Sequence, residues 1–297
     1  MPDLFFQKMK KKTLVMSGAM STMLAREGAN LGGCVSQWIV DHPEVYQDLV
    51  RDYYQVGCDI VSAATSSLNR IALSKFGLAD KTEELNQRVI QIIKAVQPQG
   101  TFVSGNIGPT GKFLKPLGEL TLDELLDAYG QQAKALAAGG AEIINILTMY
   151  DLEEAVAALH AAKFHTGLPI IVSLAFNPAA QGYRTMMGVS PQEAAQRLQA
   201  EGADVIGANC GSLDLEQVTE VLHLLKAHCG KPLIAKPNAG SPRVVDGREQ
   251  YSIGPHQFAE HVPQWLEAGA GILSACCGSS PAHLKEIVKK VQEIGQG

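Results

Sequence analysis

The chain has 297 residues, of which 46% are hydrophobic, so it can bury the core of one large barrel or of two ordinary domains. Its apolar runs stop well short of the ~20 residues that a membrane-spanning helix needs, and the apolar residues 4–6 are too few for a signal-peptide core. The net charge of −5 is modest, and the basic run at residues 8–12 is interpreted as part of a solvated leader over residues 1–12. We therefore expect a cytoplasmic protein that binds neither membranes nor nucleic acid.

Short runs rich in β-branched residues recur along the chain, and a longer stretch with helical periodicity follows each of them, which is typical of βα units. The expected strands are residues 13–16, 59–63, 101–105, 142–146, 169–174, 204–208, 232–236 and 271–275. The expected helices are residues 44–55, 81–96, 122–138, 152–162, 191–200, 213–227, 256–267 and 283–294. This order predicts an α/β fold in which residues 1–297 form a single (β/α)8 TIM barrel.

A repeated glycine supports the barrel. Gly57, Gly140, Gly202 and Gly269 each precede an apolar run, at the start of the second, fourth, sixth and eighth expected strands. Such a glycine can adopt the positive φ of a helix C-cap, and a repeat at every second strand fits the alternating core layers of a barrel. The alternative architecture is an open doubly wound sheet, but nothing after the first strand resembles a dinucleotide-binding loop.

Three of the six cysteines fall where barrels carry their chemistry. Cys210 lies two residues past the sixth expected strand, and Cys276 and Cys277 directly follow the eighth. Side chains at the carboxyl ends of barrel strands converge on one rim, so we expect these three thiols to face one point. A disulfide framework is improbable in a long chain with irregular cysteine spacing, and the other cysteines, Cys34, Cys58 and Cys229, are interpreted as buried or surface thiols.

Three thiolates form a soft ligand set that favours Zn²⁺ and leaves the fourth tetrahedral position free, as in catalytic zinc sites. Asn238 stands in a Pro-Asn-Ala-Gly turn after the seventh expected strand, between the two strands that carry the cysteines. The alternative is that Cys210 is packed in the core, that the cysteine pair is accidental and that Asn238 is an ordinary loop residue.

Five segments together resemble the homocysteine S-methyltransferase family, which includes betaine–homocysteine methyltransferase and the homocysteine-binding module of cobalamin-dependent methionine synthase. They are residues 17–22 (SGAMST), 105–111 (GNIGPTG), 207–211 (GANCG), 237–240 (PNAG) and 276–281 (CCGSSP). The resemblance implies a (β/α)8 barrel in which Cys210, Cys276 and Cys277 bind zinc, with Asn238 as a possible fourth ligand. It further implies that a zinc-bound thiol attacks a methyl group, as in methionine biosynthesis.

The chain departs from the family where the acceptor is held. The family has an aspartate at the position of Ser17 and a glutamate at that of Leu147, and these carboxylates are associated with the amino group of the substrate. Because an ammonium in a partly dehydrated pocket needs an anion, we expect homocysteine to bind poorly and a thiol without an amine to replace it. Asn145 is either a neutral hydrogen-bonding partner of the ligand or a satisfied core residue. The expected substrate-binding residues are Ser17, Thr65, Asn145, Leu147, Thr148 and Asn209.

The methyl donors of the family include betaine, S-methylmethionine and methylcobalamin on a partner domain, so a separate corrinoid protein is a possible partner. Residues 177–190 and 241–253 are long loops that can either admit such a protein or cover a small donor. Two other functions compete: a catalytically idle zinc- and thiol-binding barrel that senses or sequesters a thiol, and a Schiff-base lyase that uses Lys236. The second is disfavoured because we expect Lys236, which precedes a Pro-Asn turn, to point to solvent or to a carboxylate.

Overall fold

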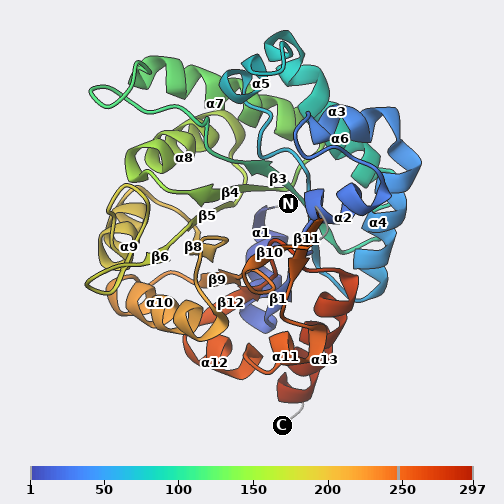
Figure 1. The fold of residues 1–297 in the computed structure, drawn as a ribbon, viewed down its shortest axis with the longest axis vertical. Helices are drawn as coiled ribbons and strands as arrows, with labels where there is room; N and C mark the ends of the chain where they lie inside the picture. The colour runs from blue at the N-terminus through green and yellow to red at the C-terminus, as the bar shows by residue number, and fades with distance from the viewer. Residues whose placement is uncertain (1, 246–247, 296–297) are drawn as a thin grey trace.

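The computed structural model describes residues 2–245 and 248–295, and its central feature is a ring of eight parallel strands surrounded by helices (Figure 1). In chain order the strands are β1 Leu14–Val15, β2 Ile60–Ser62, β3 Phe102–Ile107, β4 Ile143–Met149, β5 Ile170–Leu174, β8 Val205–Asn209, β9 Leu233–Lys236 and β12 Ala270–Leu273. A β-bridge between Met16 and Ile60 joins β1 to β2 and closes the ring. The predicted barrel is therefore confirmed, and the open sheet is excluded.

The helices follow the expected order. They are α1 Pro2–Lys11, α2 Ser21–Leu24, α3 Val35–Asp41, α4 Pro43–Gln55, α5 Arg70–Ser74, α6 Thr82–Lys94, α7 Leu122–Gly139, α8 Leu152–Thr166, α9 Pro191–Ala200, α10 Leu215–His228, α11 Pro255–Ala259, α12 Val262–Glu267 and α13 Pro281–Gly295. Side chains cap α7, α8, α9 and α10, and Thr121 and Ser190 form capping boxes at α7 and α9. The expected helix 256–267 is instead two helices, because the ring of Pro263 is incompatible with a helical turn continued from Ala259.

The first residues are not the solvated leader that their lysines suggested. Residues 2–11 form the helix α1, which Figure 1 shows near the middle of the ring, and Phe5 is only 1% exposed. Phe5 packs in a cluster with apolar residues from all eight strands: Leu14, Met16, Ile60, Phe102, Ile143, Ile171, Val205, Ile234 and Ile272. The apolar face of α1 thus belongs to the barrel core, and its lysines lie on the outside.

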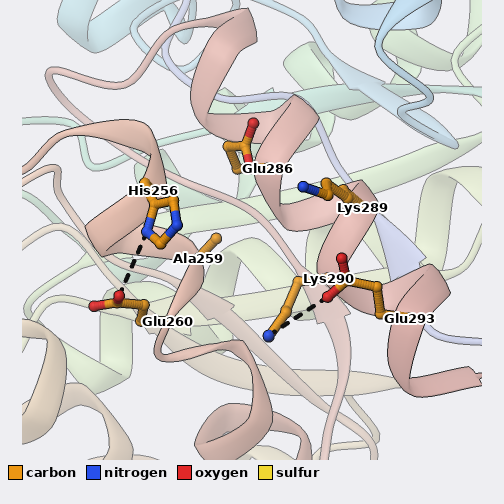
Figure 2. A pocket seen from close by; sticks show the side chains of 7 residues that line it. All are labelled: His256, Ala259, Glu260, Glu286, Lys289, Lys290 and Glu293. Carbon is orange, nitrogen blue, oxygen red and sulfur yellow. Dashed lines mark hydrogen bonds and ion pairs between the residues drawn. The ribbon is translucent and has the colours of Figure 1, made fainter. Parts of the chain in front are cut away.

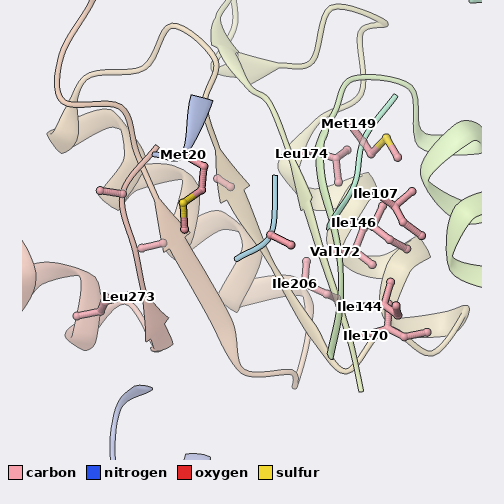
Figure 3. Close-up of a cluster of buried hydrophobic side chains, with 14 of the residues drawn as sticks. Met20, Ile107, Ile144, Ile146, Met149, Ile170, Val172, Leu174, Ile206 and Leu273 are labelled. Carbon is pink, nitrogen blue, oxygen red and sulfur yellow. The ribbon is translucent and has the colours of Figure 1, made fainter. Parts of the chain in front are cut away.

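A second and larger core fills the space between strands and helices. Side chains on a strand alternate between its two faces, so the neighbours of the inward residues point outward. Figure 3 shows part of this core, in which Ile144, Ile146, Val172 and Ile206 lie on adjacent strands. Burial of both faces explains why the strands are apolar in nearly every residue at their amino ends.

The interior becomes polar toward the carboxyl ends of the strands. Two residues beyond the apolar layer, six strands place buried polar side chains inward: Ser62, Ser104, Asn145, Ser173, Lys236 and Ser274. Buried polar groups cost free energy unless they are paired or bind a ligand. This end of the barrel is therefore where the fold favours a binding site.

The two long loops that were expected at the mouth each contain a hairpin. β6 Asn177–Pro178 pairs with β7 Tyr183–Arg184, and β10 Pro242–Val245 pairs with β11 Arg248–Tyr251. The β10–β11 hairpin appears over the centre of the ring in Figure 1. Among the described residues, every helix is too short or too polar to cross a membrane.

Candidate metal centre

Three thiols meet at the carboxyl end of the barrel. The sulfur atoms of Cys210, Cys276 and Cys277 all lie within 4.8 Å of one another, although β9 separates the strands that carry them. Ligands at about 2.3 Å from a tetrahedral zinc stand about 3.8 Å apart, so small side-chain shifts suffice to hold the ion. The structure thus brings together the three cysteines that the sequence predicted as ligands.

The backbone at these cysteines is shaped for close approach. Cys210 has a φ of 56°, a left-handed conformation that costs free energy in a residue with a side chain. Gly211 and Gly278 also have positive φ, and a Cβ atom at either would collide with Phe176 or with the ring of Tyr251. Strain and tight packing at one point indicate that the loops are built to aim the sulfur atoms.

The proton affinities of the three thiols differ because they share hydrogen bonds. Hydrogen bonds from Cys210 and Cys277 lower the pKa of Cys276 well below its usual value, and the positive charge of Lys236 lowers it further. The hydrogen bond with Cys276 raises the pKa of Cys210 to about 12, and the pKa of Cys277 is raised by the bonds with both neighbours. A cation among these sulfurs would replace the shared protons.

Asn238 ties the two cysteine loops together. Its Nδ2 donates to the Gly211 oxygen at 2.9 Å, and its Oδ1 accepts from the Cys277 backbone N–H at 3.1 Å. Asn238 is 8% exposed, and both polar atoms of its side chain are engaged in these hydrogen bonds. Its role as a fourth ligand stays a prediction. In this structure it fixes the positions of the loops.

Asn209 connects the sulfur cluster with β4. Its Oδ1 accepts from the Thr148 backbone N–H and from Ser173 Oγ, each at 2.7 Å. Its Nδ2 donates to Thr148 Oγ1 at 2.7 Å and approaches Cys276 Sγ at 3.9 Å. Thr148 itself has a φ of 60°. These hydrogen bonds orient Thr148 and Cys276. Asn209 thus supports the site in addition to its predicted contact with substrate.

Three other residues that were predicted to contact the substrate thiol, Ser17, Asn145 and Leu147, are buried and uncharged. Ser17 accepts from the Ser62 backbone N–H at 2.9 Å, and Leu147 is 8% exposed but belongs to none of the apolar clusters among the described residues. Asn145 donates to Asn106 Oδ1 at 3.1 Å, whereas its own Oδ1 has no partner among the described atoms. Asn145 is therefore only partly satisfied, which leaves an acceptor for a ligand.

Thr65 and Asn106 form a structural pair. Thr65 Oγ1 donates to the backbone oxygen of Asn106 at 2.9 Å and accepts from the backbone N–H of Asn106 at 2.8 Å, so the hydroxyl is engaged. Asn106 Oδ1 also accepts from Ser62 Oγ at 2.8 Å. Asn106 was not predicted as a site residue, although it lies within the segment GNIGPTG that carried part of the resemblance. The available signal was an asparagine within a strand that is buried throughout.

Lys236 was expected to point to solvent or to a carboxylate, and the orientation toward solvent is wrong. Lys236 is 4% exposed, because it alternates with Ile234 on β9 and so faces the barrel interior. Burial lowers its pKa, and the thiols of Cys276, Cys277 and Cys210 oppose that shift. The sequence pattern already implied this orientation, since Lys236 stands two residues beyond an inward-facing isoleucine.

Two cavities near the C-terminal segments differ in how close they come to the sulfur cluster. A cavity of about 1060 Å³ borders Gly278 and Tyr251, beside Cys277, and extends to Arg26 and His283. The pocket in Figure 2, about 180 Å³, lies between α11 and α13, and its charges are largely paired, as in His256 with Glu260. Of these two cavities, the first reaches the residue that follows Cys277, although none of the three cysteines is among its lining residues.

The chain is similar to proteins of one known family. The sequence profile of the family described as homocysteine S-methyltransferase matches residues 14–291. Methionine synthases of Mycobacterium leprae and Mycobacterium tuberculosis are each 28% identical, over 98% and 96% of this chain and 25% of each relative. The chain thus spans about a quarter of the length of these curated relatives. The homocysteine methyltransferase MmuM from Escherichia coli, in its metallated form, matches with a TM-score of 0.78 and 21% identity over 94% of this chain and 96% of that one.

Proposed function

The chain belongs to the homocysteine S-methyltransferase family, and on that premise we propose that it transfers a methyl group to a thiol held by a zinc ion on Cys210, Cys276 and Cys277. The observation that carries this proposal is the convergence of the three sulfur atoms within 4.8 Å at the mouth of the barrel. A metal with three protein ligands keeps one position for an exchangeable ligand, which a structural zinc site does not.

The donor set fits zinc. Thiolates are soft ligands, and the hydrogen-bonded thiols already place one low-pKa group, Cys276, among them. All six cysteines are free, as ligands must be, and free thiols agree with a protein of the reducing cytoplasm. Asn209 and Asn238 supply the supporting hydrogen bonds that metal ligands need in order to stay oriented.

When bound, zinc would lower the pKa of an acceptor thiol, which is otherwise about 8.5, so that its sulfur is nucleophilic at neutral pH. In the transfer, the acceptor sulfur bonds to the methyl carbon, the donor keeps the electron pair of the broken bond, and the thiol proton passes to solvent. The cysteines hold the reacting sulfur in place, and Asn209 keeps Cys276 and Thr148 oriented around it.

The acceptor is a thiol without a neighbouring ammonium group. Ser17, Asn145 and Leu147 line the β1 and β4 side of the interior without a carboxylate. An ammonium buried there would lack a paired anion, which costs several kcal/mol. The open Oδ1 of Asn145 can accept one hydrogen bond, but a neutral oxygen compensates a charge less well than a carboxylate.

Two classes of donor fit the cavity beside Cys277. Its volume of about 1060 Å³ holds a small onium compound, and its position at the barrel mouth also suits a methylated corrinoid presented by a separate protein. The relatives named methionine synthase are about four times longer than this chain. A corrinoid donor on a separate protein remains part of the proposal.

Zinc-edge X-ray absorption on zinc-loaded protein tests the proposal. We expect three sulfur ligands at ~2.3 Å without a thiol and four with a suitable one. Mass spectrometry should then detect the methylated thiol when S-methylmethionine, betaine or methylcobalamin is added, which would also exclude an idle zinc barrel. Absence of zinc from the cysteines, or a sulfur count that no thiol changes, would overturn the proposal.

A further inference from the structure

Lys236 is a buried lysine inside the barrel, and the acidic groups whose charges act on it are thiols, chiefly those of the sulfur cluster. Among the described residues only two side chains with carboxyl groups are buried, Asp59 and Glu154. Asp59 pairs with Lys12 at 2.6 Å, and Glu154 accepts from Thr110 and Tyr129. Burying an ammonium without an anion is costly, so the interior around Lys236 favours a negatively charged ligand.

The sulfur cluster accounts for only part of this preference. β9 lies between the strands that carry the cysteines, and Lys236 pairs in register with Asn209, the residue before Cys210. It stands two residues before Asn238, deeper in the barrel than the cysteine loops. A thiol that binds through its sulfur at the mouth and extends inward would bring its other end toward Lys236.

The opposite wall is neutral. Ser17 and Asn145 offer hydroxyl and amide groups, and Leu147 offers an apolar surface. Lys236 is therefore the one charged residue type in this interior layer, and its polar neighbours on the adjoining strands are Asn209 on β8 and Ser274 after β12. A layer of this kind discriminates between ligands by the sign of their charge.

We propose that Lys236 determines acceptor specificity by binding the carboxylate of a small thiol acid that carries no amine. This inference rests on the proposed function, because it takes the acceptor sulfur to be held at the cysteine cluster. Lys236 is not assigned a step in methyl transfer. Its ammonium pairs with the carboxylate through a charge-assisted hydrogen bond and so fixes the acceptor chain below the sulfur.

Three matched thiols separate the charge effects. 4-Mercaptobutyrate is homocysteine without its amino group, 4-mercaptobutyramide replaces the carboxylate of that compound with a neutral amide, and homocysteine adds the ammonium. Titration calorimetry on zinc-loaded protein measures their dissociation constants without a methyl donor. We expect the carboxylate to bind about 10- to 100-fold more tightly than the amide, as for hydrogen bonds to charged groups, and homocysteine to bind more weakly than the carboxylate.

Variants assign the effect to one residue. K236M should bind 4-mercaptobutyrate and 4-mercaptobutyramide equally, whereas K231M, two residues before the start of β9, should keep the preference of the wild type. K236R keeps the charge and should keep most of the preference, which guards against a fold defect in K236M. Zinc content and the melting temperature of each variant complete the comparison.

Each outcome decides between the two proposals. A carboxylate preference that survives in K236M, or equal losses for both thiols, would overturn the role of Lys236 and would leave the zinc proposal standing. A wild-type protein that prefers the amide or homocysteine would do the same. Zinc-loaded protein that binds none of the three thiols would instead overturn the proposed function and this inference with it.

Discussion

The two sides of the barrel mouth are built from the same kind of strand ends but differ in what they hold. On β8, β9 and β12, three thiols converge and Asn238 and Asn209 brace them. On β1 to β4, neutral polar groups such as Ser17 and Asn106 bond mainly to one another and to the backbone. The first side presents ligands for the proposed zinc ion, whereas the second is held together by its own hydrogen bonds.

Under the proposed function, the zinc ligands and the neutral wall of the acceptor pocket are carried by different strands, and Lys236 on β9 is the one acceptor-binding residue on the metal side. A metal centre requires all three ligands at fixed positions, because losing one removes a bond that nothing else replaces. A binding pocket can exchange Asp for Ser or Glu for Leu and still fold, because a neutral network costs little to bury. Acceptor specificity can therefore change while the sulfur cluster stays the same.

Removing one of the three thiols should abolish zinc binding at the sulfur cluster. In C276A we expect zinc affinity to fall by far more than the ~100-fold typical of losing a supporting residue, and methyl transfer to become undetectable. The reason is that Cys276 is the most buried and most readily ionised of the three thiols. Zinc content after dialysis, measured by mass spectrometry, checks this.

C229A is the matched control. Cys229 is also buried but follows α10, and it does not belong to the sulfur cluster. Its zinc content should equal that of the wild type. Retention of zinc by C276A would show that the ion binds elsewhere.

Much of the fold could be predicted from the sequence. The eight barrel strands lie within three residues of their expected bounds, and the barrel and the family are confirmed. The periodicity of buried strands determines where they begin, and the Gly-led repeats mark the preceding helix ends. The break at Pro263 was also visible in principle, because proline cannot continue a helix from Ala259.

The parts that were missed depend on packing rather than on pattern. The run of lysines in α1 concealed the apolar face that places Phe5 against the barrel core. Lys236 was assigned to solvent by residue type, whereas its strand register buries it. The positions of Ser17, Leu147 and Thr148 follow from the fold, but their contacts with a substrate stay predictions.

Placing a carboxylate on the neutral side of the barrel mouth should change which thiol binds more tightly. In L147E we expect homocysteine to bind about 10- to 100-fold more tightly and 4-mercaptobutyrate to bind more weakly, because a buried carboxylate pairs with the ammonium and repels the anion. Calorimetry on zinc-loaded protein measures both changes. L147Q, neutral and of the same size, is the control.

The reverse result for L147E would contradict the assignment of this wall to the acceptor. If homocysteine affinity is unchanged while the protein keeps its zinc and its melting temperature, Leu147 does not face the ligand. S17D would then show whether the β1 side of the pocket receives the amino group instead.

Asn209 bonds to Thr148 on β4 and approaches Cys276, so its loss should affect both sides of the barrel mouth. The loss of zinc affinity should be smaller than in C276A. In N209A we expect zinc affinity to fall about 10-fold, at the low end for a residue that orients a metal ligand, because Cys276 and Thr148 lose a shared partner. N69A is a suitable control, since Asn69 caps α5 and bonds to the Ala72 N–H. That variant should lose stability but not zinc affinity. Equal zinc affinity in N209A and the wild type would separate Asn209 from the metal centre.

Thr65 should give the smallest effect on function. T65V keeps the shape of the side chain but removes the hydroxyl that bonds twice to Asn106, so we expect the free energy of unfolding to fall by about 1–3 kcal/mol. Thiol affinity should change less than about twofold, because that hydroxyl is already engaged within the network. Urea unfolding and calorimetry measure the two quantities on the same protein. A loss of thiol affinity without a loss of stability would instead make Thr65 a ligand contact, and the network on β2 and β3 would then extend into the acceptor pocket.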